Sequence, residues 1–235
     1  KLLKKNICGK MFPWIESYLF QRSARVKLDG RTSSLVKIRE GVPQGGVISP
    51  TLFTIFIDDI VENLTSHISR ALHADDLSVW TASEHITTAA YRMQESLNGI
   101  SHWAHQWLVS INKTKTEATC FSLSPKREKF CLKIDGEEVP QQDTPTYLGV
   151  KLDRKLTWSP HLTVMENKAV RRMAIMKKLA GTQWGANSRI LRQVYTSTVR
   201  PHLEYASSSW STAAKTNTAK LSKIQNASLR LITGG

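Results

Sequence analysis

The chain has 235 residues, 40% of them hydrophobic, so it can bury a sizeable core in one large domain or two modest ones. Nothing in it approaches the roughly 18 consecutive apolar residues of a membrane span, and its basic opening runs into no signal-peptide core, so we expect no membrane partner. The net charge of +14 indicates a polyanionic partner.

The three cysteines, Cys8, Cys120 and Cys131, show neither metal-ligand spacing nor a disulfide framework, which suits a reducing, intracellular protein. The sequence begins without an initiator Met, so we expect a segment of a longer polyprotein. His102 and His105 are spaced for one face of a helix, and without further ligands we interpret them as helix surface.

The first elements are predicted to be a helix and a hairpin. Apolar residues over positions 7–21 recur at helical spacing. Alternation over residues 24–28 indicates a strand that turns at Asp29 and Gly30 and pairs with residues 35–38.

A loop and a second helix follow. Glycines and prolines over residues 40–50 allow the backbone to approach a flat ligand closely. We expect the helix to have Ser49 as its N-cap and Pro50 at its first position. Asp58 and Asp59 fall within this helix, where neighbouring side chains diverge by about 100°. We therefore interpret this acidic pair as structural or solvent-facing.

A second acidic pair, Asp75 and Asp76, lies between two short apolar runs over residues 72–80. The flanks favour strands, and the acidic pair is predicted to form the turn of a β-hairpin. Two carboxylates about 4 Å apart repel by roughly 4 kcal/mol near a protein surface. Hard oxygen ligands of this kind suit Mg²⁺. This pair is therefore our candidate metal site.

The next stretch alternates helix, strands and hairpins, which describes an α+β sheet with helices on one face. The predicted elements are a long helix over residues 86–107, strands over residues 109–112 and 116–121, a hairpin around Asp135 and Gly136, and a strand over residues 146–152.

Beyond about residue 154 the pattern is helical. One helix is capped by Ser159 and Pro160 and ended by Gly181, a second is broken or kinked by Pro201, and a third covers residues 221–232.

The positive charge is concentrated in this helical end. Residues 151–235 hold 15 Lys and Arg against 3 Asp and Glu, a net charge of +12, whereas residues 1–150 carry +2. Lys168, Arg171 and Arg172 cluster within about one helical turn. We expect them to contact nucleic acid.

Three motifs stand in a fixed order: Gly41-Val42-Pro43-Gln44-Gly45, Ala74-Asp75-Asp76 and Asn112-Lys113-Thr114-Lys115-Thr116. In these motifs the chain resembles the reverse transcriptase of non-LTR retrotransposons, and it looks most like the jockey-type elements of arthropods. The likeness covers essentially all 235 residues, including Tyr147-Leu148-Gly149-Val150 and the segments 203–206 and 224–226.

The resemblance implies the fold of a right-hand polymerase. Residues 1–154 would be the palm, an antiparallel sheet with helices on one face, with part of the fingers. Residues 155–235 would be the helical thumb or connection region.

The resemblance also implies an RNA-directed DNA polymerase that transfers a nucleotide from a dNTP to a primer 3′-hydroxyl on an RNA template. Asp75 and Asp76 would be catalytic metal ligands for Mg²⁺, with Mn²⁺ as the alternative ion. In this chemistry two ions about 3.5–4 Å apart activate the primer hydroxyl and stabilise the departing pyrophosphate.

Further residues are implied on three other segments. They are the nucleotide and template contacts Pro43, Gln44 and Gly45, Lys115 as the group that helps protonate pyrophosphate, and the primer-grip residues Tyr147, Leu148 and Gly149. The implied partners are the RNA template, the DNA primer, dNTP and the rest of the polyprotein, in a cytoplasmic and nuclear ribonucleoprotein.

Two departures from the family pattern leave alternatives open. His73 stands where the family usually has Tyr or Phe, and the other catalytic Asp of the family lies upstream of the region corresponding to Lys1. We therefore expect the segment to be inactive alone. The alternatives are a non-catalytic nucleic-acid-binding remnant of a mobile element and a metal-dependent nuclease, although no further acidic or histidine cluster accompanies Asp75 and Asp76.

Overall fold

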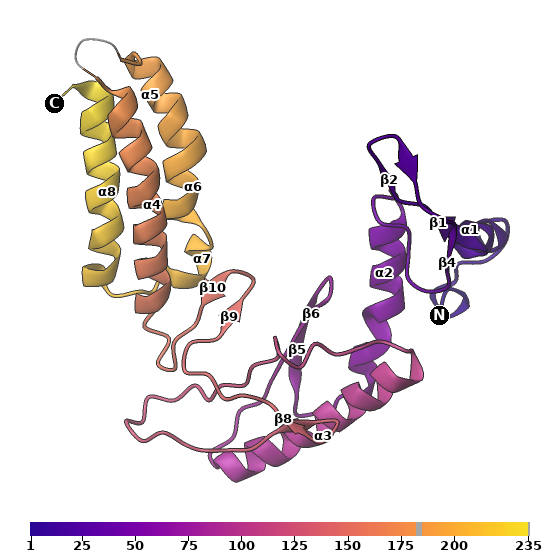
Figure 1. Cartoon of the computed structure of the whole chain (residues 1–235). Helices are drawn as coiled ribbons and strands as arrows, with labels where there is room; N and C mark the ends of the chain where they lie inside the picture. The colour runs from indigo at the N-terminus through magenta and orange to yellow at the C-terminus, as the bar shows by residue number, and fades with distance from the viewer. Residues whose placement is uncertain (182–184, 235) are drawn as a thin grey trace. The chain divides into compact units, whose positions relative to one another are not determined.

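The computed structural model describes residues 1–181 and 185–234 (Figure 1). The chain divides into two compact units. The first contains Lys1–Ile111 and Phe130–Glu138, and the second contains Asn112–Lys129 and Val139–Gly235. Each unit is described by itself below.

The first unit combines helices with four antiparallel strand pairs. Its helices are η1 (Leu3–Lys5), α1 (Met11–Leu19), α2 (Ser49–Ile57), η2 (Asp58–Asn63) and α3 (Ile86–Gln106). Its strands are β1 (Arg22–Ala24), β2 (Lys27–Leu28), β3 (Arg31–Thr32), β4 (Val36–Ile38), β5 (Ser69–His73), β6 (Asp76–Trp80), β7 (Lys133–Ile134) and β8 (Glu137–Glu138).

The core of the first unit lies along α3, which contacts η2 and β7. Leu97, Ile100 and Ala104 repeat at helical spacing and are buried, and Trp103 is only 2% exposed. This spacing is the reason that residues 86–106 form one long amphipathic helix. The helix predicted over residues 86–107 is confirmed.

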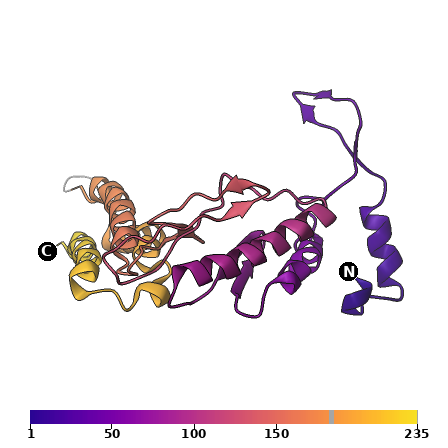
Figure 2. The same ribbon diagram turned by 90° about the horizontal axis from the view of Figure 1, so that it is seen from below.

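The N-terminal hairpins differ in pairing from the prediction. The Asp29–Gly30 turn is confirmed, but β2 pairs with β3 across it, and the pair projects from the rest of the unit (Figures 1 and 2). The segment β4 pairs instead with β1, which begins at Arg22. The prediction of a single strand over residues 24–28 was wrong. Strands β1 and β2 pair with different partners, and residues 25 and 26 between them belong to neither strand.

The second unit is mainly helical. Its strands are β9 (Thr146–Tyr147) and β10 (Val150–Lys151), and its helices are α4 (Ser159–Leu179), α5 (Ser188–Val194), η3 (Tyr195–Val199), α6 (Arg200–Glu204), α7 (Ser207–Trp210) and α8 (Lys215–Thr233).

Three long helical segments form a bundle in which α4 packs against α8 and against the α5–η3–α6 segment (Figure 1). The core consists of aliphatic and aromatic side chains from all three segments: Leu162, Met165, Ala169, Met176, Leu191, Tyr195, Val199, Leu203, Leu221 and Ile224. The helical prediction for this region is confirmed. Since so many apolar side chains converge, the bundle is stabilised by burial rather than by helix propensity.

The predicted break or kink at Pro201 takes the form of a change of helix type just before this residue. Pro201 has no N–H and cannot bond to the preceding turn. The turn before it, η3, is a π-helix, in which the hydroxyls of Thr196, Ser197 and Thr198 donate to carbonyl groups three or four residues earlier. These bonds occupy carbonyls in the irregular turn.

The fold is a mixture of helices and small antiparallel sheets, as predicted at the level of class. Within the described residues the strands form five two-stranded sheets. The strands predicted over residues 109–112 and 116–121 are absent apart from one bridge between Ala118 and Gln141. A strand needs a partner along its length, and among the described residues these segments pair with another segment only at that bridge.

Candidate functional site

Asp75 and Asp76 lie at one hairpin tip, as predicted. Strands β5 and β6 pair antiparallel with His73 opposite Asp76, so that Ala74 and Asp75 form the two-residue turn. His73, Asp75 and Asp76 are all exposed. Ala74 has a φ of 53°, a left-handed conformation that is unfavourable for a residue other than glycine. The hairpin therefore presents the acidic pair from a tight, strained turn.

The chemistry of this tip fits a hard cation. Its carboxylates are exposed oxygen ligands of the kind Mg²⁺ prefers. In the part of the chain that the structure describes, no group of three or more His, Cys, Asp or Glu could hold a metal ion. The tip offers two carboxylates, so the other ligands of an ion bound there would have to come from water, substrate or another segment.

The other acidic pair is structural, as interpreted. Helix α2 ends at Ile57, and Asp58 and Asp59 open the 3-10 helix η2 rather than continuing the α-helix. Asp58 forms an ion pair with Lys5. Asp59 accepts hydrogen bonds from Lys1 Nζ at 2.5 Å and from Trp103 Nε1 at 2.8 Å.

The Lys1 ammonium group occupies an aromatic cage. It lies 4.4 Å from the ring centroids of Phe56 and Trp103 and 3.9 Å from that of Trp107. Burial alone would raise the pKa of Asp59, but the hydrogen bonds from Lys1 and Trp103 outweigh burial and hold the pKa below its usual value. Sequence reasoning missed this cage because its members come from three distant segments.

The loop that carries Pro43, Gln44 and Gly45 is held by a hydrogen bond from the first residue of α2. Ser49 was predicted to cap α2, but Ile48 is the N-cap residue and Ser49 is the first helical residue. The Ser49 hydroxyl donates instead to the Pro43 carbonyl at 2.5 Å. Gln44 and Gly45 of this loop are exposed.

Tyr18 completes the support of the loop. Its hydroxyl lies 3.1 Å from Ser49 Oγ, and the two share a hydrogen bond. A Cβ atom on Gly46 would lie 2.1 Å from the Tyr18 hydroxyl and 2.7 Å from Ser49 Oγ. Gly46 is therefore required by close packing and not by its backbone conformation.

We expect Gly46→Ala to lower the free energy of unfolding by about 1–3 kcal/mol, because the added methyl overlaps two hydroxyl groups. Urea denaturation would measure the change. Adding Tyr18→Phe to Gly46→Ala removes the nearest atom and should recover part of the loss. Val47→Ala, at a neighbouring side chain that is 96% exposed, should change little. A Gly46→Ala variant as stable as the parent would contradict the close packing.

Lys115 lies in a turn organised by Asn112. The Asn112 side-chain oxygen accepts from the Lys115 backbone N–H at 3.2 Å and from the Thr114 hydroxyl at 2.8 Å. Such side-chain bonds replace strand pairing with a turn. The Lys115 side chain is exposed.

The segment over residues 146–152 is a hairpin and not one strand. Leu148 and Gly149 have φ of 46° and 75°, so both are left-handed and reverse the chain between β9 and β10. Tyr147 is half-buried, whereas Leu148 and Gly149 are exposed at the tip. The hairpin implied by the resemblance is the form observed.

The basic residues of α4 are accessible. Lys168, Arg171 and Arg172 are all exposed, while Ala169 between them is fully buried. The helix therefore turns Ala169 to the core and leaves this basic cluster on its outer surface.

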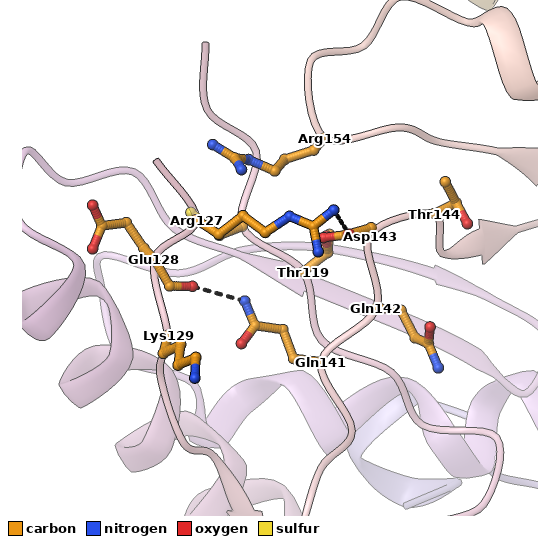
Figure 3. A pocket seen from close by; sticks show the side chains of 10 residues that line it. Thr119, Arg127, Glu128, Lys129, Gln141, Gln142, Asp143, Thr144 and Arg154 are labelled. Atoms are coloured by element: carbon orange, nitrogen blue, oxygen red, sulfur yellow. Dashed lines mark hydrogen bonds and ion pairs between the residues drawn. The ribbon is translucent and has the colours of Figure 1, made fainter. Parts of the chain in front are cut away.

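A polar pocket of about 330 Å³ lies in the second unit (Figure 3). Arg127 pairs with Asp143 at 2.8 Å, and the Gln141 amide donates to the Glu128 carbonyl at 2.9 Å. Arg154 donates to backbone carbonyls on the adjoining loop. The arginines of this pocket are already bonded to a carboxylate and to backbone carbonyls, so we interpret them as links between the loops that line it. No sequence motif could have revealed the pocket.

The candidate residues are divided between the units. The first unit carries Asp75 and Asp76 at one tip and Pro43, Gln44 and Gly45 on one loop. The second unit carries Lys115, the hairpin at residues 147–149 and the basic cluster of α4.

The sequence profile of one family, reverse transcriptase (RNA-dependent DNA polymerase), matches residues 1–152. This range includes both acidic pairs, the loop over residues 40–50, Lys115 and the hairpin at residues 147–149. The chain belongs to the reverse transcriptase family. The fold implied by this membership is palm-like.

Relatives from mobile elements of Drosophila melanogaster match almost the whole chain. It is 32% identical to the RNA-directed DNA polymerase from mobile element jockey and 31% identical to the probable RNA-directed DNA polymerase from transposon BS, in each case over 98% of this chain. It covers 26% of the length of each relative. The predicted resemblance to jockey-type, non-LTR retrotransposon reverse transcriptases is confirmed.

A helix long and apolar enough to cross a membrane does not occur in the part of the chain that the structure describes.

Proposed function

We propose that the chain is the palm and thumb part of a retrotransposon reverse transcriptase, active as an RNA-directed DNA polymerase within a longer protein. The observation that carries this proposal is the exposed Asp75–Asp76 pair at the β5–β6 tip, in a chain of this family. The substrates would be an RNA template, a DNA primer and dNTP.

In the reaction the primer 3′-oxygen attacks the α-phosphorus of the dNTP and pyrophosphate leaves. Asp75 and Asp76 would hold Mg²⁺, which supplies charge neutralisation at the phosphates when bound. The loop at Pro43, Gln44 and Gly45 would contact template and nucleotide. Lys115 would donate a proton to the departing pyrophosphate.

Primer extension on an RNA template tests this function. We expect no extension by the 235-residue chain alone, because two carboxylates hold the metal ions too loosely without a further ligand. We expect extension when the upstream region of the natural polyprotein is restored. Robust extension by the isolated chain would show that the third ligand is already present in it, and failure of the restored protein would overturn the proposed function.

The basic surface of the second unit supports nucleic-acid binding as the alternative function, one that needs no catalysis. Residues 151–235 carry +12, and Lys168, Arg171 and Arg172 are exposed together. A non-catalytic remnant would keep this property after loss of polymerase activity.

Replacing Lys168, Arg171 and Arg172 with Gln should make the salt dependence of duplex or hybrid binding shallower. Each phosphate contact contributes a log–log slope of about −0.9, so the change should be about one to three units, with little effect on sequence preference. Binding isotherms at several salt concentrations measure it. The charge-matched variant Lys27→Gln, Arg31→Gln, Lys37→Gln should change the slope less. An unchanged slope in the first variant would place the binding surface elsewhere.

A further inference from the structure

The tip of the β9–β10 hairpin is held by a residue more than fifty positions downstream. The Tyr205 hydroxyl donates a hydrogen bond to the Leu148 carbonyl at 2.6 Å. A Cβ atom on Gly149 would lie 3.1 Å from the same hydroxyl and 3.5 Å from ring atom Cε1. The Tyr205 ring therefore covers Gly149 while its hydroxyl fixes the direction of the preceding carbonyl.

A second contact holds the end of the same hairpin. The backbone N–H of Lys151 donates to His161 Nδ1 at 3.3 Å. His161 lies in the first turn of α4 and is only 2% exposed. Burial lowers the pKa of His161, which favours the neutral imidazole, the form in which Nδ1 can accept a hydrogen bond. Its ring centroid is 6.5 Å from that of Tyr205.

Tyr205 is in turn fixed to the helical bundle. It occupies the corner between α6 and α7, next to Leu203, which is buried in the bundle core. The Trp210 indole N–H donates to the Tyr205 carbonyl at 2.8 Å. The backbone that carries the Tyr205 ring is therefore held at the corner of the bundle.

The exposure of these residues argues against simple core packing. Tyr205 remains 51% exposed and Leu148 39% exposed, so their contact buries little apolar surface. The contact instead fixes the orientation of the Leu148 carbonyl, because this left-handed turn residue is held by a specific hydrogen-bond donor.

We propose that Tyr205, assisted by His161, is a positioning residue that ties the Tyr147–Leu148–Gly149 hairpin to the helical bundle. The primer end placed by the hairpin and the duplex held by the bundle then move as one body. The effect on primer and duplex rests on the proposed polymerase function. The link between the hairpin and the bundle rests only on contacts within the second unit.

The kinetic test is Tyr205→Phe in the polymerase that includes the upstream region. This change removes one hydroxyl and keeps the ring. Loss of one hydrogen bond corresponds to about a threefold to tenfold effect, which we expect as a rise in KM for primer–template with KM for dNTP unchanged. Tyr195→Phe, at a tyrosine buried in the same bundle and outside the hairpin contact, is the matched control. Equal effects on both Michaelis constants, or none, would overturn the positioning role.

Amide hydrogen exchange in the 235-residue chain tests the tie without catalysis. Tyr205→Phe should speed exchange of the Gly149 and Val150 amides about threefold to tenfold, and His161→Ala should do so at Lys151, while Tyr195→Phe should leave all three unchanged. Faster exchange together with an inactive polymerase would retain the tie and reject the proposed function. Unchanged exchange would reject the tie whatever the activity.

Discussion

Changing Asp75 to Asn, in a protein that includes the upstream region, will reduce primer extension by about 10²–10³-fold or more. The substitution keeps the size of the side chain and removes the negative charge at the tip of the β5–β6 hairpin. Electrostatic groups that act on the transferring phosphate are commonly of this magnitude. Single-turnover extension with saturating dNTP would separate this loss from weaker binding.

The chain contains its own control for this experiment. Asp58 belongs to the other acidic pair of the chain. It lies on η2 and forms an ion pair with Lys5 at the surface. Asp58→Asn should change extension by less than about twofold, because surface ion pairs contribute little. Equal losses from Asp75→Asn and Asp58→Asn would show that the hairpin tip is not the catalytic centre.

Asp59→Ala is expected to lower the free energy of unfolding by about 3 kcal/mol. It leaves the Trp103 indole N–H without its acceptor and the Lys1 ammonium with the Phe56 carbonyl but without a carboxylate, in a site where the side chains of Lys1 and Asp59 are only 10% and 18% exposed. Removing one partner of a mostly buried pair has effects of this size. Urea denaturation followed by tryptophan fluorescence would measure the change.

The same pair predicts a pH dependence. The pKa of Asp59 is lower in the folded chain than the ordinary value of 3.8. Its contribution is therefore complete above pH 3.8 and is lost as the pH falls through the lower folded pKa. Asp59→Ala should flatten this part of the stability profile. A variant that keeps the parent's acid sensitivity would assign that sensitivity to other carboxylates.

The aromatic cage can be tested from its other side. Lys1→Ala should be less stable than the parent, and n-butylammonium should restore part of the loss by entering the cage. Tetramethylammonium has no N–H to donate to Asp59 and should restore less. If both ions act equally, the aromatic rings rather than Asp59 determine recognition of the cation.

Local patterns were sufficient where one segment determines its own structure. Apolar spacing predicted α3 and α4, and the flanks of Asp75 and Asp76 predicted a hairpin with both acids at its tip. The divergence of Asp58 and Asp59 followed from helical geometry alone. Periodicity and turn chemistry are short-range properties, so the sequence states them directly.

Contacts between distant segments were not predictable in the same way. Ser49 has the residue type and position of an N-cap, but its hydroxyl bonds to Pro43 and Tyr18. Lys1 shows no pattern that would place it among three aromatic rings. Residues 109–112 have strand propensity but pair with no strand among the described residues. In each case the partner of a residue depends on which groups of a distant segment lie close to it in the folded chain.

Anchoring of the β9–β10 hairpin by Tyr205 and His161 bears on where a shortened protein can end. The family match stops at residue 152, one residue beyond β10. A protein truncated there would retain Asp75, Asp76, Lys115 and the whole hairpin, yet both side chains that hold the hairpin would be missing. We therefore expect the smallest piece with an ordered turn at Leu148 and Gly149 to extend at least through Trp210, well past the end of the family match.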